Sequence, residues 1–139
     1  MSRFLLDTGI ASDYTNRRLG VFERAGQESS RGNKIGIAIP VLAELHFGIE
    51  CSASRERNHP KLRKALASLT VWPFNEAAAE EYGRLAAELR RIGRPMQQID
   101  IMIAAIARTL GDCVVVSKDS DLVAVPGLSV ENWSVAQVE

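Results

Sequence analysis

Four acidic side chains lie in apolar surroundings, and they are the residues of this chain best suited to carry out chemistry. They are Asp7 after Phe-Leu-Leu, Glu44 within Val-Leu-Ala-Glu-Leu, Asp100 within Ile-Asp-Ile-Met-Ile, and Asp119 after Val-Val-Val-Ser-Lys, with Asp121 two residues further on. A carboxylate in such surroundings costs on the order of several kcal/mol unless it is paired or bound to a cation. Lys118 is the only Lys or Arg within these apolar segments. A hard divalent cation such as Mg²⁺ is therefore the expected counter-charge, because it takes oxygen ligands and retains waters for a substrate phosphate.

Each acid, taken alone, also has a purely structural explanation. Asp7 could cap a helix, Glu44 could face solvent, Asp100 could complement a helix dipole, and Asp119 and Asp121 could belong to a turn. Taken together these explanations weaken, because Asp7 and Asp119 both follow apolar strands. The carboxyl ends of parallel strands share one edge of a sheet, so we expect the acids to gather there.

Strand and helix patterns alternate along the chain. The sequence predicts strands over 3–7, 34–39, 71–72, 114–116 and 128–130, and helices over 8–14, 19–29, 41–49, 59–69, 76–92 and 99–110. This order predicts βα units and a mostly parallel sheet with helices on both faces.

Bulk composition fits one globular domain over residues 1–139. The chain has 139 residues, 46% of them hydrophobic and 24% charged, with a formal net charge of zero. No apolar run approaches the roughly 20 residues that a membrane helix needs, and the N-terminus is a poor signal peptide. We therefore expect a cytoplasmic protein that does not enter a membrane. Cys51 and Cys113 have no ligand-like spacing, and we expect both to be buried free thiols.

Basic residues cluster although the net charge is zero. The clusters are Arg17 with Arg18, the group Arg55, Arg57, Lys61, Arg63 and Lys64, and the group Arg90, Arg91 and Arg94. Solvated helix faces explain any single cluster, whereas flanking cations would also hold a nucleic-acid backbone. Trp72 and Trp133 are expected in the core. His46 and His59 are left out of the site, since His46 is two residues from Glu44 and so lies on another helix face.

Five segments together resemble one known family. LLDTG, AELHFG, QIDIMIAA and VVSKDSDL, followed by GLSVENW, are similar to the motifs of PIN-domain nucleases, and more narrowly to VapC-type toxins of bacterial type II toxin–antitoxin systems. The resemblance covers nearly the whole chain. It implies a three-layer α/β/α domain around a central, mostly parallel sheet.

The resemblance also implies an activity and a set of site residues. The acids Asp7, Glu44, Asp100 and Asp119 would bind Mg²⁺, or Mn²⁺ as a substitute, and hydrolyse RNA phosphodiesters. Thr8, Ser117 and Asp121 would support them, and Asp121 is an equally acidic alternative to Asp119 as the fourth acid. The candidates for RNA binding are Arg17, Arg18, Arg55, Arg57 and Lys61. The implied partners are an RNA substrate such as tRNA, a small VapB-like antitoxin and a second copy of the chain.

Three other functions remain open. Asp-Thr-Gly at residues 7–9 is typical of aspartic proteases, but those of the retroviral type are nearly all β, and helical periodicity dominates here. A Mg²⁺-dependent phospho-acceptor module would use Asp7 with Lys118, and it leaves Glu44 and Asp100 unexplained. A PIN fold could also bind RNA without cleaving it.

Overall fold

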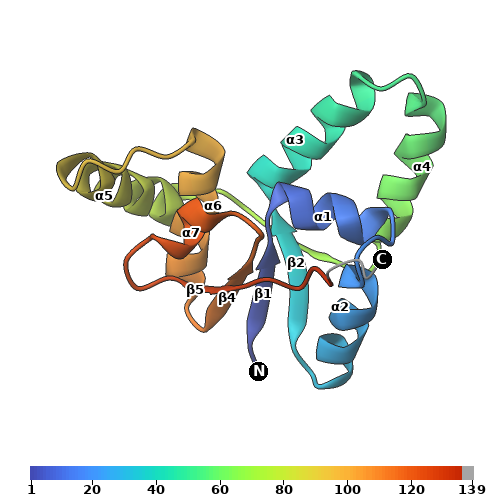
Figure 1. Cartoon of the computed structure of the whole chain (residues 1–139), viewed down its shortest axis with the longest axis horizontal. Coiled ribbons are helices and arrows are strands. Elements are labelled where there is room, and N and C mark those ends of the chain that lie inside the picture. The colour runs from blue at the N-terminus through green and yellow to red at the C-terminus, as the bar shows by residue number, and fades with distance from the viewer. Residues whose placement is uncertain (136–139) are drawn as a thin grey trace.

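The computed structural model describes residues 1–135, which form a five-stranded sheet flanked by helices (Figure 1). The strands are β1 (Arg3–Leu6), β2 (Lys34–Ala38), β3 (Thr70–Trp72), β4 (Cys113–Val116) and β5 (Ser129–Glu131). The helices are α1 (Thr8–Thr15), α2 (Val21–Ser30), α3 (Ile39–Glu50), α4 (Arg55–Leu66), α5 (Glu76–Arg91), α6 (Gln98–Leu110) and α7 (Ser120–Val123). Every strand pairing is parallel, in the order β3-β2-β1-β4-β5. The predicted parallel sheet is confirmed.

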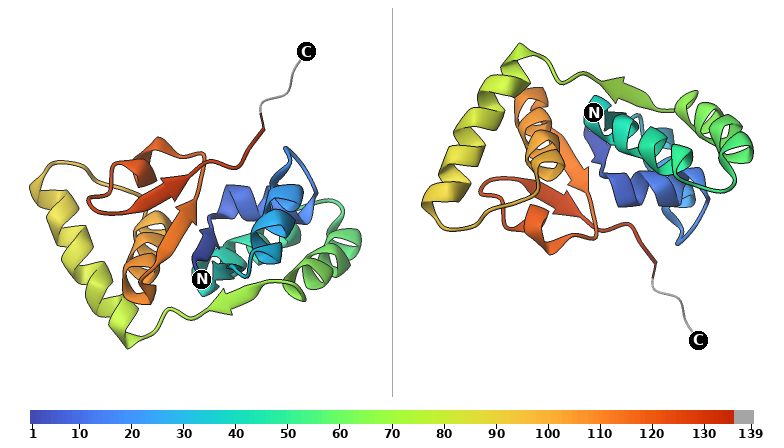
Figure 2. Two further views of the ribbon diagram at one scale, coloured as in Figure 1. Left: turned by 90° about the horizontal axis from the view of Figure 1, so that it is seen from below. Right: turned by 90° about the horizontal axis from the view of Figure 1, so that it is seen from above.

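The strand order determines which helices cover which face. The chain moves from β1 to β2 to β3 in one direction through α1–α4, then crosses back to β4 through α5 and α6 and on to β5 through α7. Since such crossovers are right-handed, the two groups of helices lie on opposite faces of the sheet. Figure 2 shows α1–α4 on one side and α5–α7 on the other. This is the expected three-layer α/β/α arrangement.

The core lies where β1 and α6 meet their neighbours. Leu5 and Leu6 of β1 and Ile103 of α6 are fully buried. Trp72 and Trp133 are also buried, as predicted, and Trp133 packs on Phe4 with ring centroids 5.1 Å apart. Within residues 1–135, no helix has both the length and the apolar content to cross a membrane.

Three sequence predictions were wrong. Cys51 is exposed rather than buried, and Cys113 is half-buried. Cys51 ends α3, and α3 and α4 form an arm that projects from the body of the molecule (Figure 1), so its tip is out of reach of the core. Helix α4 begins at Arg55 rather than at residue 59. The short helix α7 was not predicted, because four residues are too few to show a period.

Gly36 allows β2 and β3 to approach closely. It lies opposite Thr70 in the parallel register of the two strands. A Cβ atom on this residue would lie 2.1 Å from the Thr70 carbonyl oxygen and 2.8 Å from a ring atom of Trp72. Backbone cannot yield as a flexible side chain does, so the edge strand β3 depends on this glycine.

We predict that Gly36→Ala lowers the free energy of unfolding by about 1–3 kcal/mol, because the added methyl group overpacks the β2–β3 contact. Gly83→Ala is the matched control: it adds the same methyl group inside α5, where nothing lies within 4 Å. That change should stabilise the protein by up to about 1 kcal/mol through helix propensity. Urea unfolding of the two variants measures both effects, and equal stability of Gly36→Ala and wild type would contradict the packing argument.

Candidate active site

The site lies outside the carboxyl ends of β1 and β4, where the strand order reverses direction. These strands are parallel neighbours, with Leu6 opposite Val116, and the Asp7 amide donates to the Val116 carbonyl oxygen at 3.0 Å. Asp7 and Ser117 therefore leave the sheet side by side. The chain after β1 continues into α1 on one face, and the chain after β4 continues into α7 on the other. Such a reversal opens a crevice that is the usual ligand site of parallel α/β sheets.

Asp7 is a buried carboxylate, only 9% exposed, directly after the carboxyl end of β1. Its Oδ1 accepts a hydrogen bond from the Ile10 amide at 2.9 Å and caps α1, and its Oδ2 accepts one from the Ser117 hydroxyl. Burial raises the pKa of Asp7, and these two hydrogen bonds oppose that effect. Asp7 therefore does cap α1, but the cap does not use all the hydrogen-bonding capacity of its carboxylate. Each oxygen keeps a further lone pair for another partner.

A chain of hydrogen bonds joins Asp119 to Asp7. The Asp119 amide donates to the Ser117 oxygen at 2.8 Å, and the Ser117 hydroxyl donates onward to Asp7. The Asp119 side chain accepts from the Asp121 amide at 2.8 Å and caps α7. Ser117 is itself buried. It therefore holds the loop after β4 against the end of β1.

Glu44 and Asp100 reach the same region from two helices. Glu44, on α3, is exposed and accepts a hydrogen bond from the Thr8 hydroxyl. Asp100, in the first turn of α6, is half-buried. Burial is the largest cause that raises the pKa of Asp100, followed by the negative charges of Asp119, Asp7, Glu44 and Asp121. Together they bring this pKa to about 6. Residues far apart in the sequence are thus gathered around Asp100.

Asp119 and Asp121 differ in how strongly they act on the pKa values of the other acids. Asp119 is the foremost negative charge acting on the pKa of Asp100 and also raises the pKa of Asp7, whereas Asp121 is the last of the four charges acting on Asp100. Asp119 therefore lies electrostatically closer to the other acids. This favours Asp119 over Asp121 as the fourth acid of the site.

Asp13 is a buried acid that the sequence analysis did not single out. It is 5% exposed, and its carboxylate binds the Lys118 ammonium at 3.1 Å and the Arg18 guanidinium at 3.5 Å. Lys118 is thereby tied to α1, next to the loop that carries Asp119. The polar face of a short helix gave no sign of this pairing, which arises because Lys118, in the loop after β4, reaches Asp13 on α1. The phospho-acceptor alternative loses its lysine, because Lys118 contacts Asp13 rather than Asp7.

The donors at the site suit a hard cation that keeps most of its waters. All are carboxylate or hydroxyl oxygens, and like charges raise the pKa of Asp100. In the part of the chain that the structure describes, no three His, Cys, Asp or Glu side chains lie close enough together to enclose a metal ion. Mg²⁺ commonly binds through only one or two carboxylates and retains several waters. The residues present therefore fit Mg²⁺ better than a metal that needs a full cage of protein ligands.

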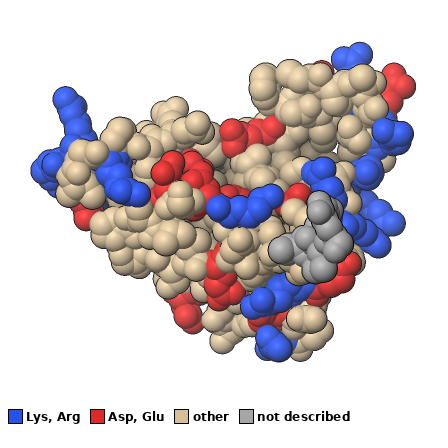
Figure 3. Space-filling model, in the orientation of Figure 1, with Lys and Arg blue, Asp and Glu red and all other residues tan. Residues whose placement is uncertain are grey.

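The basic residues divide into paired and unpaired groups. Figure 3 shows acidic side chains on both walls of a hollow in the upper edge of the molecule. Basic side chains lie below this hollow and along the right-hand edge of the molecule. Arg18 is engaged by Asp13, whereas Lys61 donates to the Asn16 side chain at 3.1 Å and Arg17 lies over the Phe22 ring. Arg55 and Arg57 are exposed in the first turn of α4. The predicted RNA-binding residues thus differ in their contacts, and an acid already engages one of them, Arg18.

The two histidines lie together on the α3–α4 arm. His59 is hydrogen-bonded to Glu50 at 2.6 Å, and the His46 ring packs 5.8 Å from that of His59. Each histidine contacts the other, and His59 also contacts Glu50. These contacts agree with leaving both histidines out of the acidic site. The protease alternative fails on the fold, because a parallel sheet with helices on both faces is unlike an all-β protease.

Comparison with known proteins agrees with the fold and the motifs. The PIN domain family matches residues 4–128. The tRNA(fMet)-specific endonuclease VapC of Shigella flexneri is 35% identical over 135 residues, which are 96% of this chain and all of that protein. Ribonuclease VapC2 of Haemophilus influenzae is 32% identical over 134 residues, covering 96% of this chain and 99% of the relative.

Solved structures give the same result. The chain superimposes with a TM-score of 0.88 and 28% identity on a chain of the Rickettsia felis VapBC2 complex bound to a DNA fragment from its promoter, covering 95% of this chain and 99% of the other. The DNA-bound VapBC complex of Salmonella typhimurium gives 0.86 and 32%, covering 96% and 99%. With the acids gathered at the carboxyl ends of β1 and β4, these likenesses show that the chain belongs to the PIN-domain family, among the VapC endoribonucleases of toxin–antitoxin systems.

Proposed function

We propose that this protein cleaves RNA by divalent-metal-dependent phosphodiester hydrolysis at the crevice between β1 and β4. The observation that carries the proposal is the convergence of acids from three other segments on Asp100. Burial and the charges of these acids raise the pKa of Asp100 to about 6. Clustered carboxylates alone would repel a phosphate. Their arrangement makes chemical sense with a cation among them, which reverses the sign of the site.

Asp7 and Asp100 are the proposed principal ligands of Mg²⁺, with Mn²⁺ as a substitute. When bound, such a cation lowers the pKa of a coordinated water and stabilises negative charge on the phosphoryl oxygens. Glu44 would bind directly or through water and orient the attacking water, with Thr8 holding its carboxylate. Asp119 would support the site from the β4 side. Ser117 would act as a positioning residue, since its hydroxyl fixes one oxygen of Asp7.

A groove beside the acids would receive the RNA. It has a volume of about 330 Å³, and Thr8 and Glu44 line one end while Asn16 and Lys61 line the other. The acids and the cation would hold the scissile phosphate, and the nearby basic residues would hold its neighbours. Transfer RNA is the proposed substrate class, because the Shigella and Salmonella relatives are tRNA(fMet)-specific endonucleases.

The proposed protein partner is a small VapB-like antitoxin. Structural neighbours of this chain are VapBC toxin–antitoxin complexes, and two of them are bound to DNA. A second copy of the chain is the other proposed partner. Ile39, 46% exposed, and Phe47, 71% exposed, lie two turns apart on α3, so an apolar stripe on this helix is available for contact.

The first prediction of this proposal is metal-dependent cleavage that requires Asp7. Purified protein, free of antitoxin, should cut a total tRNA pool into discrete fragments with Mg²⁺ or Mn²⁺ and not with EDTA. Asp7→Asn should reduce the cleavage rate at least about 100-fold, since even indirect partners of a metal ligand contribute about 10–100-fold. The asparagine keeps an acceptor for the Ile10 amide, so the helix cap survives.

Asp112→Asn is the matched control for this experiment. It makes the same chemical change at an exposed residue with φ of 47°, a conformation that asparagine tolerates, at the amino end of β4. Its cleavage should equal that of wild type. Absence of cleavage by a well-folded wild-type protein under both metals would remove the nuclease mechanism and leave RNA binding without catalysis.

A second prediction concerns the stability of the metal-free protein. Asp100→Asn removes one charge from the acidic cluster, so the melting temperature in EDTA should rise. Discounting for the solvent around a half-exposed side chain, we expect about 1 kcal/mol, or about 3–5 °C. The same variant should lose cleavage and gain less stability from Mg²⁺ than wild type gains. A lower melting temperature in EDTA would instead assign Asp100 to the helix dipole of α6, which a carboxylate complements by about 0.3–1 kcal/mol.

A further inference from the structure

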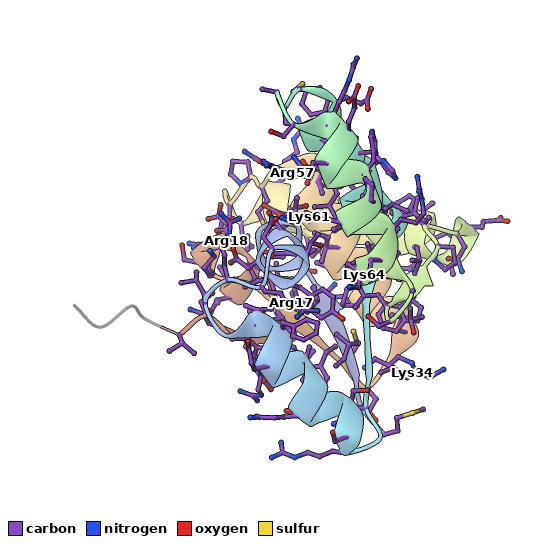
Figure 4. The ribbon with its side chains drawn as sticks, turned by 90° about the vertical axis from the view of Figure 1, so that its right-hand side faces the viewer. Arg17, Arg18, Lys34, Arg57, Lys61 and Lys64 are labelled. Atoms are coloured by element: carbon purple, nitrogen blue, oxygen red, sulfur yellow. The ribbon has the colours of Figure 1, made fainter. Side chains whose placement is uncertain are left out.

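Three basic residues of α4 share one face of the helix. Arg57, Lys61 and Lys64 are spaced i, i+4 and i+7, which aligns them along a single stripe. Leu62 is buried and packs toward the core. Figure 4 shows this stripe continuing past Arg17, at the end of α1, toward Lys34 at the start of β2. Cations from three separate segments therefore follow one another across this side of the molecule.

Most of these cations are not neutralised by acids. Within residues 1–135, no carboxylate lies within ion-pair distance of Lys34, Lys61, Lys64 or Arg17. Five arginines elsewhere do form ion pairs with acids. These pairs join Arg18 to Asp13, Arg24 and Arg31 to Glu28, and Arg84 and Arg108 to Glu81. In the described part of the chain the four cations named above carry no such pair, so this side of the molecule presents positive charge to an anionic partner.

Arg17 is held in position before any partner arrives. Its backbone has φ of 54°, in the left-handed region that a residue other than glycine rarely adopts. Its guanidinium lies 4.2 Å from the centre of the Phe22 ring. A strained backbone and a cation–π contact together restrict where the guanidinium can go.

Neighbouring hollows lie between Glu44 and these cations. The groove that contains Thr8 and Glu44 ends at Thr15, Asn16 and Lys61. The same three residues begin a second hollow of about 390 Å³, which adds Arg17, Lys64 and Phe22. A third shares Tyr14, Phe22 and Ser68 with the second and reaches Lys34. Neighbouring hollows therefore follow one another from Glu44 past Lys61, then past Arg17 and Lys64, to Lys34.

We propose that Lys61, Lys64, Arg17 and Lys34, here called the basic track, bind the phosphate backbone of the RNA on one side of the scissile bond. The proposal rests on the nuclease function above and deepens it, because it requires a substrate that extends several nucleotides beyond the cut. A polyanion with regularly spaced charges fits a row of unpaired cations along a groove. Lys61 lines both the hollow that contains Glu44 and the one that contains Lys64, so it would contact the phosphate nearest the site.

The test is RNA binding by a triple variant, Arg17→Ala with Lys61→Ala and Lys64→Ala. Binding to fluorescently labelled total tRNA is measured by anisotropy between about 50 and 200 mM salt, in the non-cutting Asp7→Asn protein. We expect a Kd about 10–30-fold weaker at about 0.15 M salt, and a salt dependence of log Kd smaller by about 2. When the triple variant is made in the cleaving protein, which keeps the native Asp7, it should raise KM for tRNA in similar proportion while kcat is retained.

Two further variants make the result specific. Arg90→Ala with Arg91→Ala and Arg94→Ala removes the same charge from exposed residues at the far end of α5, and it should change Kd little. Arg17→Lys with Lys61→Arg and Lys64→Arg keeps the charge and should bind nearly as well as the parent. Melting temperatures of all variants exclude a loss of folding as the cause.

The outcomes separate this proposal from the proposed function. Equal weakening by the α5 variant would mean that only net charge matters and would overturn the track. Unchanged Kd in the track variant would also overturn it, and a concurrent loss of antitoxin binding would assign the surface to that partner. Failure of the wild-type protein to cleave would instead count against the nuclease function, because anisotropy tests the track without catalysis.

Discussion

The parallel pairing of β1 with β4 is the constraint on which the site depends. These two strands are far apart in the sequence, and their pairing places Asp7 beside Ser117 at the point where the sheet reverses direction. The Ser117 hydroxyl then joins the Asp7 carboxylate to the Asp119 amide. Because α1 and α7 leave in opposite directions, nothing of the sheet itself fills the space above these strand ends. A slip of one residue in this register would separate Asp7 from Ser117 and turn the apolar side chains of β1 to the wrong face.

Negative charge at this edge is concentrated and only partly compensated. Asp7 is buried and Asp100 is half-buried. The negative charge of Asp119 raises the pKa of Asp7, and the charges of Asp119 and Asp7 both raise the pKa of Asp100. The nearest lysine, Lys118, is engaged by the buried Asp13 and so cannot pair fully with the cluster. The fold thus holds its acids in an unfavourable arrangement that the proposed cation would relieve. Sites with strongly perturbed carboxylates in a crevice are typical of catalysis rather than of stability.

The α3–α4 arm connects the acidic edge to the basic side of the molecule. Its first helix carries Glu44 at the crevice, where the Thr8 hydroxyl holds it. Its second helix carries Lys61 and Lys64 along the adjoining hollows. The arm also exposes Phe47, an apolar side chain that a globular protein would ordinarily cover. One projecting element therefore contributes to the proposed catalytic site, to the proposed RNA-binding surface and to a surface suited to a protein partner.

The sequence alone indicated the strands, most of the helices and the candidate acids. Apolar runs that end at Asp7 and Asp119, and an all-round apolar helix that opens at Asp100, are local patterns, and they located the strands, the helices and the carboxylates without structural information. The parallel sheet followed from their alternation. The exposure of Cys51 could not be predicted in this way, because α3 has a high apolar content and its departure from the body depends on tertiary packing.

Only the tertiary structure decided how the charges are partnered. Asp13 appears in the sequence as an ordinary polar residue of a short helix, yet it is buried and binds both Lys118 and Arg18. The same pairing removes Arg18 from the set of free cations and leaves Arg17, its neighbour, facing Lys61 and Lys64 across a hollow. Which charges are neutralised depends on contacts between segments distant in the chain, and no local periodicity carries that information. The physical reason is that residue type determines which kinds of partner a side chain can bind, whereas tertiary packing determines which partners lie within reach.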